Sequence, residues 1–423
     1  MSTAVLQLER GLGWPSLVGS SASPVGWPSP ESVRHEEMVA DETSRADVSR
    51  ETETDAVPSE TRTTESTATT EKPAEATTPA AQAEAGEPSA AAAEEAMAAV
   101  SVSRETATDE RDALAASLPD TDHDTPLARA VAEDARKRIA LTGRVFPKPA
   151  QTRVLTVANQ KGGVGKTTTT VNIAAALAQA GLTVLVIDID PQGNASTALG
   201  IEHHAEVTSI YDVLVEGTAM HEVVQECPDV PGLWCAPATI DLAGAEIELV
   251  SLVARETRLD KAITAYLEHT ANQGGVVPDY VLIDCPPSLG LLTVNAFVAA
   301  QEVFIPIQCE YYALEGLSQL LKNIELIRSH LNPDLHVSTI LLTMYDGRTR
   351  LSAQVADEVR AHFPDQVLRN TVPRSVRVSE APSHGQTVMT YDPNSSGALS
   401  YLAAASELAD RGAASDPSAP AQN

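Results

Sequence analysis

The chain has 423 residues, of which only 4% are aromatic, and its formal net charge at pH 7 is −29. This negative charge argues against a protein that coats nucleic acid through bulk electrostatic attraction, so any DNA contact must be local. The sequence holds no run of about 18 apolar residues and does not begin with a basic segment followed by an apolar one, so we expect neither a membrane span nor a secretory signal. These features predict a cytoplasmic protein with one large domain and a tail, or with two domains.

The first 123 residues differ sharply from the rest in composition. They contain 24 Asp and Glu residues against 8 Lys and Arg, and their only aromatic side chains are Trp14 and Trp27. Runs rich in Thr, Ala, Glu and Pro cannot bury enough apolar surface to offset the entropy lost on folding. We therefore predict that residues 1–123 form a disordered, acidic, low-complexity tail, and that residues 413–423 form a short disordered tail at the other end.

Two short repeats interrupt the acidic tail. The sequence GWPS occurs at residues 13–16 and 26–29, and VSRETETD, which begins at Val48, returns as VSRETATD from Val102. Repeated motifs that contain a tryptophan are typical of segments that dock on a partner. Drift within a duplicated tail would leave the same pattern, so both interpretations stay open.

Residues 124–150 have a different composition from the tail. Apolar side chains recur at roughly helical spacing between Leu127 and Leu141, and basic residues are interleaved with them. This pattern predicts a basic amphipathic linker helix that ends before Pro147. Such a helix can pack on the following domain, contact DNA or stay solvated, and we favour a packed or solvated linker.

The most specific motif is NQKGGVGKTT at residues 159–168, a phosphate-binding loop of the GxxxxGK[ST] type with Gln160 in place of the first glycine. Glycines let backbone N–H groups approach phosphate oxygens, while Lys166 reaches the β- and γ-phosphates and the Thr167 hydroxyl binds Mg²⁺. An apolar strand is predicted at residues 153–158, and a helix whose N-terminus faces the anion at residues 168–180. A second lysine, Lys161, stands where ordinary loops have none, which indicates a nucleotide site shared between two subunits.

Four further apolar runs follow the loop, at residues 183–189, 279–285, 302–307 and 337–343. Helical patterns separate them, notably at residues 311–331 and 351–363. Nearly continuous apolar strands that alternate with helices predict an α/β fold, a P-loop NTPase with a mostly parallel twisted sheet flanked by helices on both faces. We place this domain at residues 151–412. Ligands in such sheets bind beyond the carboxyl ends of the strands.

Aspartates occur where two of these strands end. Asp188 and Asp190 follow the second strand, and Asp284 ends the third. A carboxylate in this place holds Mg²⁺ beside the phosphate loop, which is the role we expect for Asp284. Asp190 is the better candidate to orient the attacking water. An aspartate after a strand is often only a helix N-cap, but the neighbouring loop favours the catalytic interpretation.

Four segments resemble the ParA family of chromosome- and plasmid-partitioning ATPases: KGGVGKTTT, DIDPQGNAS, DYVLIDCPPSLG and the late VPRSVRVSEAPSHGQTVMTYDPNSSGA. The resemblance covers roughly residues 153–409 and none of the acidic tail. It implies that two subunits sandwich two ATP molecules, and that Lys161 crosses the interface to the γ-phosphate of the other subunit's ATP. It also implies that Asp190 assists hydrolysis and that the ATP dimer binds DNA regardless of sequence until hydrolysis releases it.

The expected sites follow from the motifs and the resemblance together. The catalytic residues are Lys161, Lys166 and Asp190, and the Mg²⁺ ligands are Thr167 and Asp284. The residues expected to bind ATP are Lys161, Gly162, Gly163, Val164, Gly165, Lys166, Thr167, Thr168, Asp284 and Pro373, the last beside the adenine. The resemblance places DNA contacts at Arg348, Arg350, Arg374 and Arg377. Guanidinium groups that hold phosphates make binding salt-dependent and indifferent to sequence.

The resulting prediction is a nucleoid-associated chromosome-partitioning ATPase whose hydrolysis is stimulated by a ParB-like centromere-binding protein. The alternative is a ParA-like ATPase that positions a protein cargo or a cell-pole complex. A membrane-positioning ATPase of the MinD kind needs a basic amphipathic C-terminal helix, whereas this chain ends in ASDPSAPAQN. Iron–sulfur carriers need cluster-ligating cysteines, and the four cysteines here form no CxxC pair. A repressor with a degenerate ATPase is disfavoured by the intact loop.

Overall fold

The computed structural model describes residues 126–310 and 313–414. The tail predicted for residues 1–123, with Trp14, Trp27 and both repeats, lies outside the described residues, as do residues 415–423 of the predicted C-terminal tail. Within the described ranges, no helix is long and apolar enough to cross a membrane.

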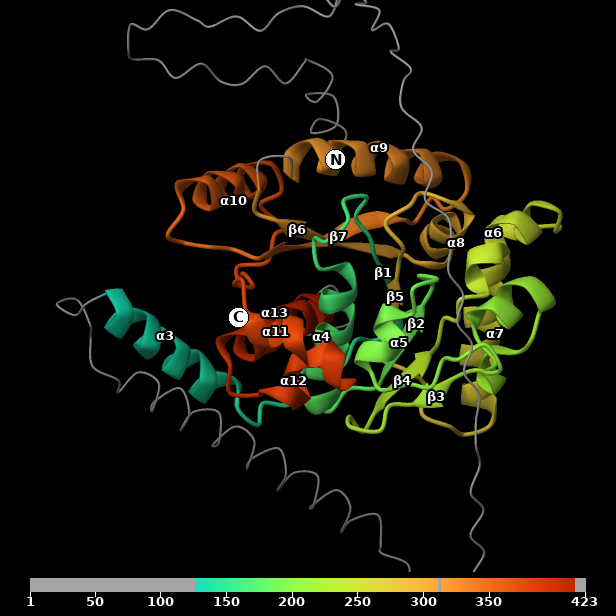
Figure 1. The fold of residues 1–423 in the computed structure, drawn as a ribbon, viewed down its shortest axis with the longest axis horizontal. Helices are drawn as coiled ribbons and strands as arrows, with labels where there is room; N and C mark the ends of the chain where they lie inside the picture. Colours follow the sequence, from blue (N-terminus) through green and yellow to red (C-terminus); the bar gives the residue numbers. More distant parts are fainter. Residues whose placement is uncertain (1–125, 311–312, 415–423) are drawn as a thin grey trace, which may run out of the picture. The chain divides into compact units, whose positions relative to one another are not determined.

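A seven-stranded sheet forms the centre of the described domain (Figure 1). Its strand order is β3-β4-β2-β5-β1-β6-β7, and every neighbouring pair is parallel except β3 with β4. The strands are β1 (Arg153–Val157), β2 (Val184–Asp188), β3 (Gln225–Glu226), β4 (Leu233–Ala236), β5 (Tyr280–Asp284), β6 (Glu302–Gln308) and β7 (His336–Thr343). The chain passes from β1 to β2 on one side, whereas β6 and β7 lie on the other side of β1. Ligands in open α/β sheets bind at such a switch point.

The predicted α/β fold is confirmed, and its five strands correspond to β1, β2, β5, β6 and β7. The prediction missed β3 and β4, because the region between β2 and β5 was expected to hold only helices. A run of four residues such as β4 is too short for periodicity to reveal. It becomes a strand because β2 offers it a parallel edge, on which Val184 is the partner of Leu233. The short antiparallel β3 then ends the sheet, and short edge strands limit unwanted pairing.

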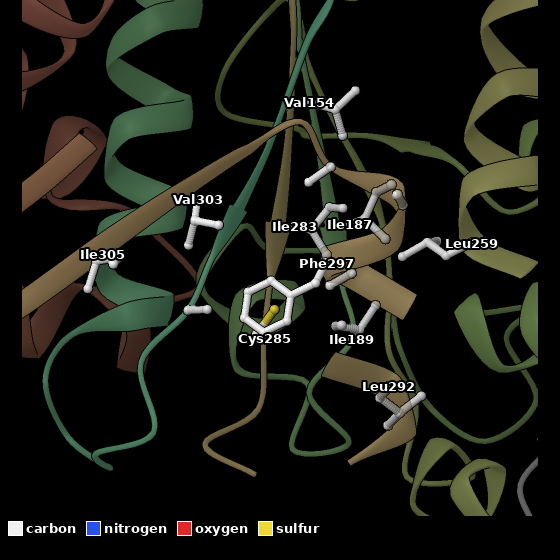
Figure 2. Close-up of a cluster of buried hydrophobic side chains, with 14 of the residues drawn as sticks. Val154, Ile187, Ile189, Leu259, Ile283, Cys285, Leu292, Phe297, Val303 and Ile305 are labelled. Carbon is white, nitrogen blue, oxygen red and sulfur yellow. The ribbon is translucent and has the colours of Figure 1, made fainter. Parts of the chain in front are cut away.

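Strand side chains divide between two cores, one on each face of the sheet. In β5, Val281 and Ile283 belong to one core, while Tyr280 and Leu282 belong to the other. Successive strand side chains point to opposite faces, so strands covered on both sides need nearly continuous apolar sequence. Figure 2 shows the first core, where side chains of the helices, such as Phe297, lie among those of the strands.

Helices cover both faces (Figure 1). The helices that contribute to the core shown in Figure 2 are α6 (Leu242–Val250), α7 (Arg258–Asn272), α8 (Leu291–Ala299), α9 (Ala313–His330) and α10 (Arg350–His362). Those that contribute to the other core are α4 (Lys166–Gln179), α5 (Asn194–Ala198), α11 (Val376–Glu380), α12 (Val388–Tyr391) and α13 (Ser396–Ala414). Single turns lie at η2 (Asp212–Glu216), η3 (Met220–Glu222), η4 (Arg255–Thr257) and η5 (Ala381–His384).

Helix α4, which follows the glycine-rich loop, is buried along most of its length. Its alanine-rich sequence lets it lie close to both the sheet and α13, where Tyr401 is buried in the same core. The Asn172 carboxamide donates to the Thr168 carbonyl at 2.7 Å and accepts from the Val388 N–H at 2.8 Å. These contacts hold α4 and the loop at its N-terminus in a fixed position.

The helix expected within residues 124–150 is α3 (Pro126–Leu141). Its Arg138 donates to the Asn394 side chain at 3.0 Å and to the Asn394 carbonyl at 2.8 Å. Beyond the helix, Arg144 donates to Ser406 and Asp410 of α13, both at 2.8 Å. The linker is thus attached to α13 and to the segment just before it. The division of the chain at residues 123, 150 and 412 stays a prediction.

Candidate nucleotide site

The loop between β1 and α4 has the backbone of an anion cradle. Gly163 and Gly165 have φ angles of 73° and 87°, in the left-handed region that other residues adopt only with strain. A Cβ atom built on Gly162 or Gly163 would meet nothing within 4 Å, so the backbone lies open to a ligand. Helix α4 begins at Lys166, and its N-cap residue Gly165 makes no side-chain cap. The N–H groups of the first turn are therefore directed at an incoming anion.

Lys166 lies inside this cradle with only 7% of its surface exposed. Burial lowers the pKa of its ammonium group, and the nearby charges of Asp284 and Asp190 oppose that shift. Among the described residues, none makes a direct ion pair with it. A buried ammonium group without an ion-pair partner is strongly stabilised when an anionic ligand binds beside it.

Asp284, at the end of β5, is fully buried and faces two threonines of α4. Its carboxylate accepts hydrogen bonds from the Thr167 hydroxyl at 2.7 Å and from the Thr170 hydroxyl at 2.9 Å. Burial raises the pKa of Asp284, and the neighbouring charge of Asp188 raises it further, although the two hydroxyls oppose the shift. A carboxylate beside a hydroxyl is a donor set that Mg²⁺ accepts, and a divalent cation supplies the positive charge that this carboxylate lacks. The residues present therefore fit a metal ion at Thr167 and Asp284.

Asp188 and Asp190 have different surroundings. The Asp188 carboxylate accepts from the Ser196 N–H and hydroxyl at 2.9 and 2.8 Å and from the Asp190 N–H at 3.1 Å. Asp188 thereby fixes the segment that follows β2. Asp190 accepts only from the Gln192 N–H, at 3.0 Å, and its charge acts on Lys166. One of its carboxylate oxygens thus has no hydrogen bond from the described residues and is available to a ligand or water.

Lys161 lies at the rim of the loop rather than inside it. Its backbone N–H donates to the Asn159 side chain at 3.0 Å, and Asn159 in turn donates to the Pro306 carbonyl of β6 at 2.8 Å. The Lys161 Nζ atom is 3.1 Å from the Glu310 Oε2 atom, and its side chain is 32% exposed. The backbone at Lys161 is thus fixed, while its amine is held by a carboxylate at the surface.

The arginines expected to bind DNA come from segments after β7. Arg348 pairs with Asp346 at 3.0 Å, and Arg377 lies 3.1 Å from Glu380. Arg374 is 3.7 Å from Glu310, which also binds Lys161. The neighbouring Pro373, expected beside the adenine, pairs through its backbone with Tyr345 just beyond β7, and the exposed Arg350 is the first residue of α10.

Three polar residues of this site escaped the sequence analysis: Asn159, Thr170 and Glu310. Glu310 follows the end of β6, so the rule that drew attention to Asp284 would also have found it. Thr170 lies one helical turn beyond Thr167, on the same face of α4. Asn159 precedes the glycine-rich segment and carries no signal of its own.

The mostly parallel sheet carries a glycine-rich loop between β1 and α4, with a buried lysine in the loop and a carboxylate that accepts a hydrogen bond from Thr167. Together these features define a P-loop nucleotide-binding protein. A family model described as an AAA domain matches residues 152–337. The chain is 51% identical over 260 residues to the sporulation initiation inhibitor protein Soj of Bacillus subtilis, a match that covers 62% of this chain and 99% of Soj. It is also 51% identical to the chromosome partitioning protein ParA of Caulobacter vibrioides, over 61% of this chain and 94% of that protein. The chain therefore belongs to the family of ParA and Soj chromosome-partitioning proteins.

Among solved structures, the chain resembles one titled cobyrinic acid a,c-diamide synthase from Mycobacterium smegmatis, with bound ATP analog and magnesium. The two are 37% identical with a TM-score of 0.51, and the match covers 62% of this chain and 93% of the other. The name of that protein indicates a synthase, whereas the two relatives with higher identity are named for sporulation and for chromosome partitioning.

Proposed function

We propose that the chain is an ATP-dependent chromosome-partitioning ATPase that dimerises on ATP, binds DNA without regard to sequence, and leaves DNA after hydrolysis. The observation that carries the proposal is the pair of lysines on one loop. Lys166 lies buried in the phosphate cradle, while Lys161 lies at its exposed rim. One subunit uses Lys166 for its own nucleotide, and Lys161 is placed for the nucleotide of a second subunit.

ATP with Mg²⁺ is the proposed ligand. The loop N–H groups and Lys166 hold the phosphates, Thr167 and Asp284 hold the metal ion, and Pro373 flanks the adenine. A Mg²⁺ ion held by Thr167 and Asp284 would polarise the terminal phosphate. Asp190, whose free carboxylate oxygen is near Lys166, orients the attacking water. The solved relative with a bound ATP analog and magnesium supports ATP and Mg²⁺ as the ligands.

Lys161 acts in the partner's site. A cation supplied by the other subunit stabilises charge on the transferring phosphoryl group, as an arginine finger does, and makes hydrolysis depend on dimerisation. The rim position of Lys161 and its anchored backbone support this role.

Arg348, Arg350, Arg374 and Arg377 form the proposed DNA surface. Three of these arginines lie beside carboxylates, which reduces the local positive charge. The net charge of −29 reduces affinity further, so binding is weak, reversible and strongly dependent on salt. This behaviour suits a cytoplasmic protein that cycles on and off the nucleoid.

The proposed partner is a ParB-like protein that inserts a basic peptide at the dimer edge, where negative charge attracts it. Adding such a partner to the DNA-bound protein should accelerate phosphate release, and unchanged turnover would contradict this part of the proposal.

An ATPase that positions a protein cargo would share the ATP cycle and differ only in the partner. The relatives named for chromosome partitioning favour the chromosome-partitioning assignment.

Co-sedimentation with DNA tests the proposal. The wild-type chain should pellet with DNA only when ATP and Mg²⁺ are present. Lys161→Ala should retain ATP binding but lose DNA binding, because the dimer no longer closes. Lys322→Ala, which removes an exposed lysine of α9, is the matched control and should behave as wild type. DNA binding by Lys161→Ala at the wild-type level would overturn the shared site.

A further inference from the structure

Glu310 is the one described residue that forms ion pairs with both Lys161 and Arg374. Its Oε2 atom lies 3.1 Å from Lys161 Nζ, and its Oε1 atom lies 3.7 Å from the Arg374 guanidinium. Lys161 is assigned above to the nucleotide of the partner subunit, and Arg374 to DNA. A single carboxylate therefore lies between the two functions that ATP is proposed to couple.

The position of Glu310 is fixed by its own segment. It follows the end of β6, where its N–H donates to the Gln308 carbonyl at 2.8 Å and its carbonyl accepts from the Ala313 N–H at 3.0 Å. The buried Gln308 amide also donates to the Glu310 carboxylate. The Gln308 amide thus holds the carboxylate toward Lys161, so the lysine has a defined position in the single subunit.

We infer that Glu310 is a positioning residue that keeps Lys161 within its own subunit until the partner's ATP displaces it. The inference rests on the proposed function and adds a reason why closure of the dimer requires ATP. Lys161 cannot reach across the interface while its ammonium remains on Glu310.

The strength of the contact suits a reversible restraint. The Lys161 and Glu310 side chains are 32% and 45% exposed, so water screens their attraction. A terminal phosphate carries more charge than a carboxylate and has three acceptor oxygens. It therefore binds Lys161 more strongly than Glu310 does once the two subunits meet. Breaking an exposed pair of this kind costs about twofold to fivefold in an equilibrium constant. A symmetric dimer breaks two such pairs, so the two factors multiply. Together the pairs raise the dimer dissociation constant by about fourfold to 25-fold.

The test is dimerisation of the full chain with a non-hydrolysable ATP analogue and Mg²⁺, without DNA, measured by sedimentation velocity. Glu310→Gln keeps the shape and the acceptor oxygen but removes the charge, and should lower the dimer dissociation constant by about fourfold to 25-fold. Glu380→Gln is the matched control. It removes an equally exposed carboxylate from Arg377, away from Lys161, and should leave dimerisation unchanged.

The double variant Lys161→Ala/Glu310→Gln separates the proposed cause from a general charge effect. It should dimerise no better than Lys161→Ala alone, because no ammonium remains to be released. An unchanged or raised constant in Glu310→Gln, an equal gain in Glu380→Gln, or a gain that persists in the double variant would each overturn the inference while leaving the shared site standing. A wild-type chain that stays monomeric at saturating analogue would contradict the proposed function itself, and the inference with it.

Discussion

Both ends of the central strands carry charged side chains that are largely shielded from water, but only at the amino ends do two of them form an ion pair. At the amino ends, Arg153 of β1 donates two hydrogen bonds to Glu302 of β6, at 2.7 and 2.6 Å, and a third to the Leu408 carbonyl at 3.0 Å. At the carboxyl ends, Asp188 of β2 lies directly beside Asp284 of β5 in the sheet. These two buried carboxylates have like charge. Burial is the larger cause of the raised pKa of Asp284, and repulsion by Asp188 is the smaller one.

The difference separates a structural cluster from a functional one. At the amino ends Arg153 and Glu302 pair with each other, so they contribute to folding without any ligand. At the carboxyl ends the chain leaves two carboxylates and the Lys166 ammonium without direct ion pairs among the described residues. Uncompensated buried charge is typical of sites that a ligand completes. We expect substitutions at the two ends to affect different properties, and four predictions test this.

The largest effect is expected for Asp190→Ala at the carboxyl ends. If Asp190 orients the attacking water, as proposed, its loss should reduce ATP turnover by about 10²- to 10⁴-fold, with ATP binding retained. The variant should accumulate on DNA as an ATP-bound dimer, which phosphate release and co-sedimentation can measure together. Asp357→Ala, which removes an exposed carboxylate of α10, is the control. Normal turnover in Asp190→Ala would overturn the assigned role.

At the amino ends, Glu302→Ala should destabilise the fold by about 3–5 kcal/mol, because it leaves the Arg153 charge buried without its partner. Denaturant unfolding measures the loss. The folded fraction should bind ATP with wild-type affinity, since the site lies at the other end of the strands. Arg153→Met/Glu302→Leu removes both charges and should recover most of the stability. A tenfold loss of ATP affinity in folded Glu302→Ala would show that the two ends of the strands do not control separate properties.

Asp284→Asn should stabilise the ligand-free fold, whereas Glu302→Ala should destabilise it. Removing a buried carboxylate that lacks a cation should stabilise the ligand-free protein by about 1–2 kcal/mol, while stabilisation by Mg²⁺ and ATP disappears. Because the folded pKa of Asp284 is raised, the wild-type chain should lose stability as pH rises from about 4 through that folded pKa. The gain in Asp284→Asn should therefore grow with pH in thermal melts. If ligand-free Asp284→Asn were less stable than the ligand-free wild type, the buried Asp284 carboxylate would not be an uncompensated charge.

The smallest effect is the acid dependence of the amino-end pair. Burial alone would raise the pKa of Glu302, but the hydrogen bonds and charge of Arg153 outweigh it and lower that pKa. The stability from this pair should be fully present above the unfolded pKa of about 4.3 and lost as pH falls through the lower folded value. Arg153→Met/Glu302→Leu should lose less stability than wild type between pH 6 and 3. Equal losses would show that the pair is not coupled to protonation.

Much of the fold and part of the site follow from local sequence. The apolar runs of β1, β2, β5, β6 and β7 are visible because strands covered on both faces are apolar at nearly every position. The glycine-rich loop is visible because close approach to phosphate requires glycine at Gly163 and Gly165, whatever the rest of the chain does. Asp188 and Asp284 stand out because they end apolar strands.

Contacts between distant segments were not predictable in the same way. Lys161 and Glu310 are 149 residues apart, as are Arg153 and Glu302. Both contacts exist because β6 lies next to β1, and β4 exists as a strand because β2 offers it an edge. The sequence by itself determined where the glycine-rich loop lies and which aspartates end the strands, because backbone conformation and apolar pattern are local properties. Only the tertiary structure decided which charges are compensated within the chain, because ion pairing depends on the order in which the strands lie side by side.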